Sequence, residues 1–176
     1  IVLCGFRHKI IFQKFHKKKI NFTEVICVKE KKLLGTGGAL TNLIRLRVND
    51  FVLINGDTLF DVDIKLLVNS LDKNRIGITA LTKNKNQKSK KLNNLILKKN
   101  IIGVGKNSSL MNGGIYFFKK KIFKYIKKVN FSLENDLLPK FIKEKMIKNI
   151  KFNWDVDGKK SFMIGDKKID KLAAKK

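Results

Sequence analysis

The residues best suited to chemistry lie between Leu33 and Asp63. Gly35-Thr36-Gly37-Gly38 is a flexible glycine turn ahead of a short amphipathic helix, and glycines let the backbone approach a ligand closely. The free N–H groups at the start of such a helix favour phosphate or other electron-rich groups. Asn55-Gly56-Asp57 follows the unbroken apolar run Phe51–Ile54, which is typical of a strand buried on both faces of a parallel sheet. One stretch could therefore hold a nucleotide, and the next a cation that bridges its phosphates.

The elements around these stretches alternate between strand and helix. Strands are expected at Ile1–Cys4, Thr23–Val28, Phe51–Ile54 and Ile76–Leu81, and helices at Lys9–Phe15, Ala39–Val48 and Ile64–Leu71. The helix at Ala39–Val48 carries apolar residues at helical spacing, namely Leu40, Leu43, Ile44 and Val48. This rhythm implies parallel pairing, so the sequence predicts an α/β fold. At 176 residues the chain is long enough for one core, and a single domain over residues 1–176 is expected.

A second group of polar residues and glycines lies further along the chain. Met111–Phe118 is expected to be a loop with two glycines followed by a strand, and the Asn112 amide could bond a sugar hydroxyl both as donor and as acceptor. A glycine bulge that enters a strand explains the same letters equally well. Phe131–Asp136 precedes a helix that is expected to run to about Lys145, and Ser132 is a suitable N-cap for it.

Three further features carry less chemical information. Leu92–Leu97 and Ile101–Val104 have the pattern of a hairpin, and the lysine-rich stretch Lys83–Lys91 is typical of a solvated loop. His8 and His16 lie in or beside the first basic helix with no residue that pairs with them, so surface or capping roles are expected for both.

The segments LGTGGAL, NGDTLFDVD, NGGIY and SLE, in this order, resemble the sugar-1-phosphate nucleotidyltransferases, and most closely the branch that activates heptose or mannose 1-phosphates. The resemblance covers essentially the whole chain. It implies a Rossmann-like, glycosyltransferase-A-like domain: a mostly parallel sheet with helices on both faces. It also implies an enzyme that transfers a nucleoside monophosphate from a nucleoside triphosphate to a sugar 1-phosphate, giving a nucleoside-diphosphate sugar and pyrophosphate for glycan or cell-surface polysaccharide precursors.

The same resemblance implies a role for each matching residue. Asp57 would hold Mg²⁺ and act in catalysis. Lys106 could contact the sugar phosphate, but Gly105 stands where the family has a glutamate, and the alternative is that Lys106 is simply solvated. The residues implied in nucleotide binding are Leu34, Gly35, Thr36, Gly37, Gly38, Asn55 and Gly56, and those implied in sugar binding are Asn112, Gly113, Glu134 and Lys106. For Glu134, a helix-capping role is the alternative to a sugar contact.

Two departures from the family pattern stand at the ends of the chain. The second metal-binding carboxylate aligns with Met163, a poor ligand for a hard cation, unless Asp155 or Asp157 supplies it through a gap. The family's first strand-loop-helix unit, which grips the triphosphate, has no counterpart, so the chain by itself is expected to be inactive. A non-catalytic homologue that binds sugar nucleotide is therefore an alternative function.

Composition constrains the partners. The net charge of +26 suggests a third possible function, a basic nucleic-acid-binding domain. The lysines are scattered along the chain and do not cluster, so binding to a specific nucleic acid is not expected. No apolar run reaches the length of a membrane span, and Cys4 and Cys27 lack metal-type spacing and suit the reducing cytoplasm. The sequence leaves open whether the protein forms a homo-oligomer.

Overall fold

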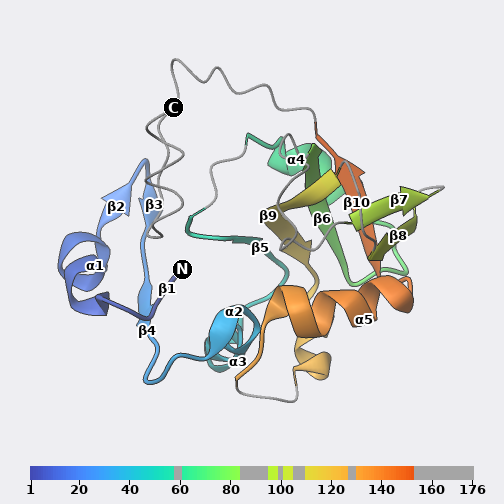
Figure 1. Ribbon diagram of the computed structural model, residues 1–176. Coiled ribbons are helices and arrows are strands. Elements are labelled where there is room, and N and C mark those ends of the chain that lie inside the picture. Colours follow the sequence, from blue (N-terminus) through green and yellow to red (C-terminus); the bar gives the residue numbers. More distant parts are fainter. Residues whose placement is uncertain (58–60, 84–94, 99–100, 105–109, 127–129, 153–176) are drawn as a thin grey trace, which may run out of the picture. The chain divides into compact units, whose positions relative to one another are not determined.

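The computed structural model describes residues 1–57, 61–83, 95–98, 101–104, 110–126 and 130–152 (Figure 1). These residues form two compact units, and each is described by itself. The first unit comprises Ile1–Phe51 and Lys119–Phe141, and the second comprises Val52–Phe118 and the chain from Ile142 onward. None of the helices in the described part of the chain combines the length and hydropathy needed to cross a bilayer.

The first unit begins with short strands around one helix. Strand β1 (Val2–Cys4) pairs in parallel with β4 (Cys27–Lys29), and helix α1 (His8–Phe15) follows β1, as the sequence predicts. The predicted strand over residues 23–28 is divided, because its two halves have different partners. Its first half, β3 (Thr23–Glu24), pairs antiparallel with β2 (Lys19–Ile20), and its second half is β4.

The glycine segment is helical, which corrects the expected flexible turn. Gly35–Gly38 forms the helical turn α2, and α3 (Thr41–Arg45) follows almost directly. The predicted apolar face is only partly buried: Leu40 and Leu43 are buried, whereas Ile44 is 42% exposed. The helix ends before Val48 because Arg47 adopts a left-handed backbone conformation with φ 52°, which cannot continue a right-handed helix.

The C-terminal part of the first unit is also helical. A 3₁₀-helix, η1, spans Lys120–Tyr125, and a π-helical turn, η2, spans Leu133–Leu137 and continues into α5 (Leu138–Lys143). The Ser132 side chain accepts a hydrogen bond from the backbone N–H of Asn135, which confirms the expected N-cap.

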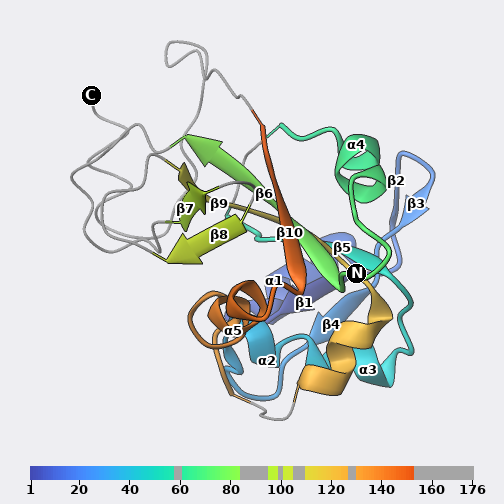
Figure 2. The same cartoon turned by 90° about the vertical axis from the view of Figure 1, so that its right-hand side faces the viewer.

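The second unit is built on a mixed sheet with the strand order β10-β6-β9-β7-β8, in which β5 also pairs with β9. The strands are β5 (Phe51–Ile54), β6 (Gly77–Lys83), β7 (Leu95–Lys98), β8 (Ile101–Val104), β9 (Leu110–Phe118) and β10 (Ile147–Lys151). Strand β10 runs parallel to β6, and β9 runs antiparallel to it (Figure 2). Strands β7 and β8 form the predicted hairpin. The structure confirms the α/β class, with antiparallel pairs inside the sheet.

One face of this sheet packs against helix α4 (Ile64–Asn69), whose start is capped by the Asp63 side chain. The buried cluster on this face consists of Val62, Leu67, Ile78, Ala80 and Ile115. Strand β5 exists as predicted, but it is not buried on both faces. Its first three residues are half-buried and Ile54 is 54% exposed, and the strand pairs with β9.

Both glycines of the NGGIY segment lie inside β9, not in a loop before it. Thr79 of β6 pairs with Tyr116, but Leu81 pairs with Asn112, so Gly113, Gly114 and Ile115 lie opposite Ala80 alone. Gly114 has a φ of 71°, which favours glycine. The glycines therefore form a bulge, the kind of irregularity that redirects side chains along a strand.

Cys4 and Cys27 are both buried free thiols on the adjacent strands β1 and β4. Burial, reinforced by the nearby Cys27, raises the pKa of the Cys4 thiol from 9.0 to about 11. A pKa that is raised in the folded state favours the neutral thiol, so the stabilisation is present below pH 9.0 and is lost as the pH rises through about 11.

We expect iodoacetamide to label Cys4 slowly at pH 8 in the folded protein and rapidly in guanidinium chloride, as read by mass spectrometry. Equally fast labelling in both states would contradict this.

Candidate active site

Helix α2 is joined by backbone hydrogen bonds to the segment that precedes η2. The N–H groups of Gly37 and Gly38 both donate to the carbonyl oxygen of Phe131, at 3.1 and 3.2 Å, and the N–H of Phe131 donates to the carbonyl oxygen of Leu34 at 3.1 Å. Two segments that are far apart in the sequence thus form one element of the first unit. The bonds also correct one expectation, because the N–H groups of Gly37 and Gly38 are engaged and are not free for a phosphate.

Phe131 also explains why two residues of α2 are glycines. A Cβ atom added at Gly37 would lie 2.2 Å from the Phe131 ring, and one at Gly35 would lie 2.5 Å from the Phe131 carbonyl oxygen. Gly35 additionally has a φ of 72°, which L-residues rarely adopt. These glycines are required by packing within the protein, whatever ligand the segment binds.

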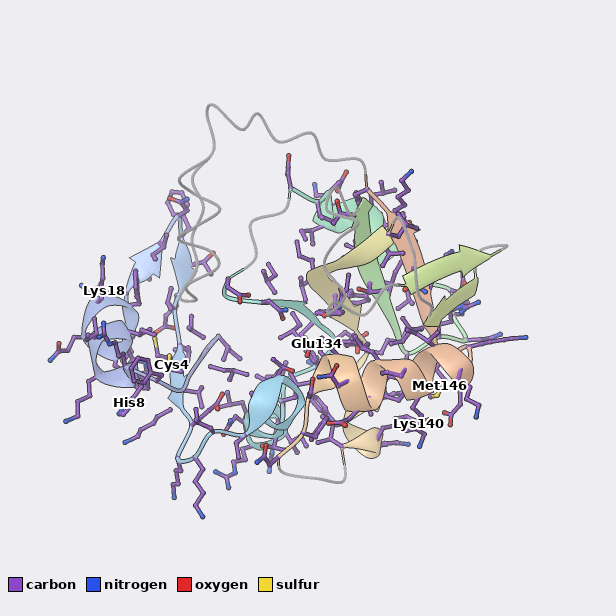
Figure 3. All side chains as sticks on the ribbon, in the orientation of Figure 1. Cys4, His8, Lys18, Glu134, Lys140 and Met146 are labelled. Atoms are coloured by element: carbon purple, nitrogen blue, oxygen red, sulfur yellow. The ribbon has the colours of Figure 1, made fainter. Side chains whose placement is uncertain are left out.

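Side chains complete this junction around the Glu134 carboxylate, which Figure 3 shows at the start of the helix formed by η2 and α5. The Thr36 hydroxyl donates to Oε2 of Glu134 at 2.5 Å, across 98 positions of sequence, and the Ser132 hydroxyl donates to the same oxygen at 3.2 Å. The Leu133 N–H donates to Oγ1 of Thr36 at 2.9 Å. A residue implied in nucleotide binding and one implied in sugar binding are therefore in direct contact.

The second unit holds Asn112 in a network of its own. Its amide oxygen accepts from the Gly114 N–H at 3.0 Å and lies 3.2 Å from the Thr79 hydroxyl, and its amide nitrogen donates to the Tyr116 hydroxyl at 2.5 Å. Thr79 and Tyr116 are buried. The amide oxygen of Asn112 is therefore occupied by hydrogen bonds within the protein, and one N–H of the amide is left for a ligand. Asn112 was expected to act as both donor and acceptor toward a sugar hydroxyl, but in this arrangement it can act only as a donor.

Asp57 lies in the turn directly after β5, and its side chain is exposed. The preceding Asn55 is fixed by a hydrogen bond of 2.9 Å from its N–H to the carbonyl oxygen of Gly114. No three His, Cys, Asp or Glu side chains in the described ranges gather into a metal site. An exposed carboxylate at a strand end nevertheless fits Mg²⁺, which accepts one or two protein carboxylates and takes its remaining oxygens from phosphates and water.

The structure divides the predicted site residues between the two units. Leu34, Gly35, Thr36, Gly37, Gly38 and Glu134 belong to the first unit, and Asn55, Gly56, Asp57, Asn112 and Gly113 belong to the second. Lys106 lies outside the described residues, as does most of the lysine-rich stretch. The same holds for Met163, which aligns with the second metal ligand, and for the alternative ligands Asp155 and Asp157.

Sequence reasoning missed three residues: Phe131, which fills the space above the glycines, and Thr79 and Tyr116, which hold the Asn112 amide. Threonine and tyrosine inside strands are ordinary β-formers, so no local signal marked these two.

His16 also has a structural role that its sequence context did not reveal. Its Nδ1 atom accepts a hydrogen bond from the N–H of Cys27 at 3.1 Å, and its ring stacks on Phe12. The imidazole therefore caps a backbone N–H group, which is one of the two roles expected for this histidine.

No family model matches the chain. Individual relatives do. The bifunctional protein GlmU of Methanococcus aeolicus is 32% identical over 171 residues, which cover 90% of this chain and 40% of that protein. The D-glycero-alpha-D-manno-heptose 1-phosphate guanylyltransferase of Campylobacter jejuni is 27% identical over 82% of this chain and 66% of its own length. The chain thus spans less than two thirds of these relatives.

Solved structures show the same fold. HddC from Yersinia pseudotuberculosis, complexed with GMP-PN, matches 84% of this chain and 67% of its own chain with a TM-score of 0.68 and 24% identity. The inositol-1-phosphate CTP transferase from T. maritima matches 99% of this chain and 75% of its own with a TM-score of 0.62 and 18% identity. The sequence relatives and the shared fold agree with the motifs read from the sequence, and the chain is similar to the sugar-1-phosphate nucleotidyltransferases in both sequence and fold.

Proposed function

We propose that the intact protein transfers a nucleoside monophosphate from a nucleoside triphosphate to a sugar 1-phosphate and releases pyrophosphate. The observation that carries this proposal is the hydrogen bond between Thr36 and Glu134. It joins the LGTGG segment, which we assign to the nucleotide, to the glutamate of the SLE segment, which we assign to the sugar. The names of the relatives support the reaction type, since they are transferases that act on phosphorylated sugars or cyclitols.

The proposed reaction needs no covalent intermediate on the protein. A phosphate oxygen of the sugar 1-phosphate attacks the α-phosphorus of the triphosphate in line, a new P–O bond forms, and the bond to the bridging oxygen between the α- and β-phosphorus breaks. Pyrophosphate leaves with that electron pair. Catalysis of this kind is mainly positioning and neutralisation of charge.

The chain's own residues supply that positioning. Asp57 provides a carboxylate for a divalent cation, Mg²⁺ in our proposal, which when bound reduces the repulsion between the two anionic substrates. Glu134 accepts hydrogen bonds from sugar hydroxyls, and Asn112 donates its remaining amide N–H to a sugar oxygen. We assign to the nucleotide Leu34, Gly35, Thr36, Gly37, Gly38, Asn55 and Gly56. We assign to the sugar 1-phosphate Gly113, through its backbone, and Lys106.

The acceptor that we favour is a heptose or mannose 1-phosphate. The relative in Campylobacter jejuni is named for D-glycero-alpha-D-manno-heptose 1-phosphate, which supports this choice of acceptor. The buried free thiols are consistent with a cytoplasmic location, where sulfhydryl groups remain reduced.

The proposal is tested by measuring pyrophosphate release from the intact protein. Each common nucleoside triphosphate is combined with mannose 1-phosphate, D-glycero-α-D-manno-heptose 1-phosphate, glucose 1-phosphate and N-acetylglucosamine 1-phosphate, with Mg²⁺ and with EDTA. We expect release that requires both substrates and a divalent cation. A folded protein that binds a sugar nucleotide but releases pyrophosphate from no pair would favour the non-catalytic homologue.

A further inference from the structure

The direction of the hydrogen bonds at Thr36 is fixed by its neighbours. The N–H of Leu133 can only donate, and it donates to Oγ1 of Thr36 at 2.9 Å. The hydroxyl has one proton of its own, and through it Thr36 donates a hydrogen bond to Oε2 of Glu134 at 2.5 Å. A threonine hydroxyl accepts and donates at the same time, and both roles are assigned here.

Ser132 repeats this arrangement on the same carboxylate. Its Oγ accepts from the N–H of Asn135 at 3.1 Å and donates to Oε2 of Glu134 at 3.2 Å. Both hydroxyls therefore bond one oxygen of a half-buried carboxylate. Hydrogen bonds from a hydroxyl to an ionised carboxylate are among the stronger hydrogen bonds in proteins, so the pair restricts the carboxylate to one orientation.

The backbone around Thr36 is held to the same element. The bonds from Gly37, Gly38 and Phe131 join α2 to the chain that leads into η2, so Thr36 and Glu134 are carried by one hydrogen-bonded element. Both residues lie in the first unit. Because Oγ1 of Thr36 already accepts one hydrogen bond and donates another within the protein, the effect of this hydroxyl is on the position of Glu134.

We propose that Thr36 is a positioning residue for the sugar 1-phosphate: its hydroxyl holds the Glu134 carboxylate in the orientation that accepts the sugar hydroxyls. This inference rests on the proposed function, in which Glu134 binds the sugar. It reassigns the Thr36 side chain, which the family resemblance placed on the nucleotide side. The glycines beside it keep the nucleotide role, while the threonine acts through Glu134.

The first experiment compares matched threonine variants of the intact protein by steady-state kinetics. Thr36→Val keeps the side-chain shape and removes the hydroxyl, whereas Thr36→Ser keeps the hydroxyl and removes the methyl group. Thr41→Val is the control, because its hydroxyl donates to the Gly38 carbonyl oxygen at 2.7 Å and does not reach Glu134. We expect Thr36→Val to raise the KM for heptose 1-phosphate about tenfold, with the KM for the nucleoside triphosphate changed by less than about twofold. Thr36→Ser and Thr41→Val are expected to keep wild-type values.

The second experiment asks whether Thr36 acts through Glu134. The affinity for D-glycero-α-D-manno-heptose 1-phosphate is measured by calorimetry, without turnover, for Thr36→Val, Glu134→Gln and the double variant. We expect Thr36→Val to weaken binding about tenfold in the wild-type background and to have almost no effect in the Glu134→Gln background. Thermal unfolding of each variant confirms that the folded state is retained.

The outcomes separate this inference from the proposed function. Additive effects in the cycle, or a raised KM for the triphosphate alone, would overturn the positioning role while normal pyrophosphate release upholds the function. Thr36-dependent binding of the sugar phosphate without any release would keep the positioning role and remove the function. A folded protein that neither binds nor turns over the sugar phosphate would overturn both.

Discussion

Replacing Asp57 by asparagine is expected to lower pyrophosphate release about 100-fold or more, a typical loss when a group that stabilises transition-state charge is removed. The change is nearly isosteric, and the side chain is exposed in the turn after β5, so the fold should tolerate it. The loss comes from the missing negative charge, because an amide oxygen binds Mg²⁺ more weakly than a carboxylate does. Release of pyrophosphate at saturating substrates, together with thermal unfolding, measures both effects.

Two comparisons sharpen this prediction. Asp61→Asn removes another exposed carboxylate four positions later, and it should leave the rate close to that of the wild type. Raising the Mg²⁺ concentration should partly restore Asp57→Asn, since the weakened site is then filled by mass action. A near-normal rate at low Mg²⁺ would remove Asp57 from the metal site.

Gly37→Ala is expected to destabilise the protein by about 1–3 kcal/mol, the usual cost of forcing an extra methyl into a packed core. Helix propensity alone would favour alanine in α2 by up to about 1 kcal/mol. The new methyl would, however, lie 2.2 Å from the ring of Phe131, which is only 9% exposed and has little room to move. Steric overlap should therefore outweigh propensity. Denaturant unfolding of the variant measures the net change.

Gly56→Ala is the matched control for this prediction, because within the described part of the chain no atom beyond its two sequence neighbours lies within 4 Å of the position that its Cβ would take. It should change the free energy of unfolding by less than about 0.5 kcal/mol. A double-mutant cycle with Phe131→Leu identifies the clash directly, since Gly37→Ala should cost less when the ring is absent. If the cost were the same in both backgrounds, contact with Phe131 would not be its cause.

Most of the regular elements could be predicted from the sequence because they depend on local patterns. Strand β6, helix α4 and the β7–β8 hairpin follow from apolar periodicity and turn residues over a few positions. The mistakes arose where a distant partner decided the outcome. The segment at residues 23–28 is divided because its halves pair with different strands, and β5 is less buried than its unbroken apolar run suggests.

The candidate site shows the same limit. The letters GTGG and SLE marked two candidate segments, but they could not show that Phe131 dictates two of the glycines or that Thr36 bonds Glu134. The sequence also could not show how the Asn112 amide is oriented, whereas hydrogen bonds with the buried Thr79 and Tyr116 give it one orientation.

The sequence by itself determined the order of the main strands and helices, the α/β class and the residue types available at the candidate site, because each depends on residue type and short-range spacing. Only the tertiary structure decided which polar atoms are already engaged within the protein. Hydrogen bonds between residues 98 positions apart depend on the path of the whole chain, and each such bond occupies a donor or acceptor position that is then closed to a ligand.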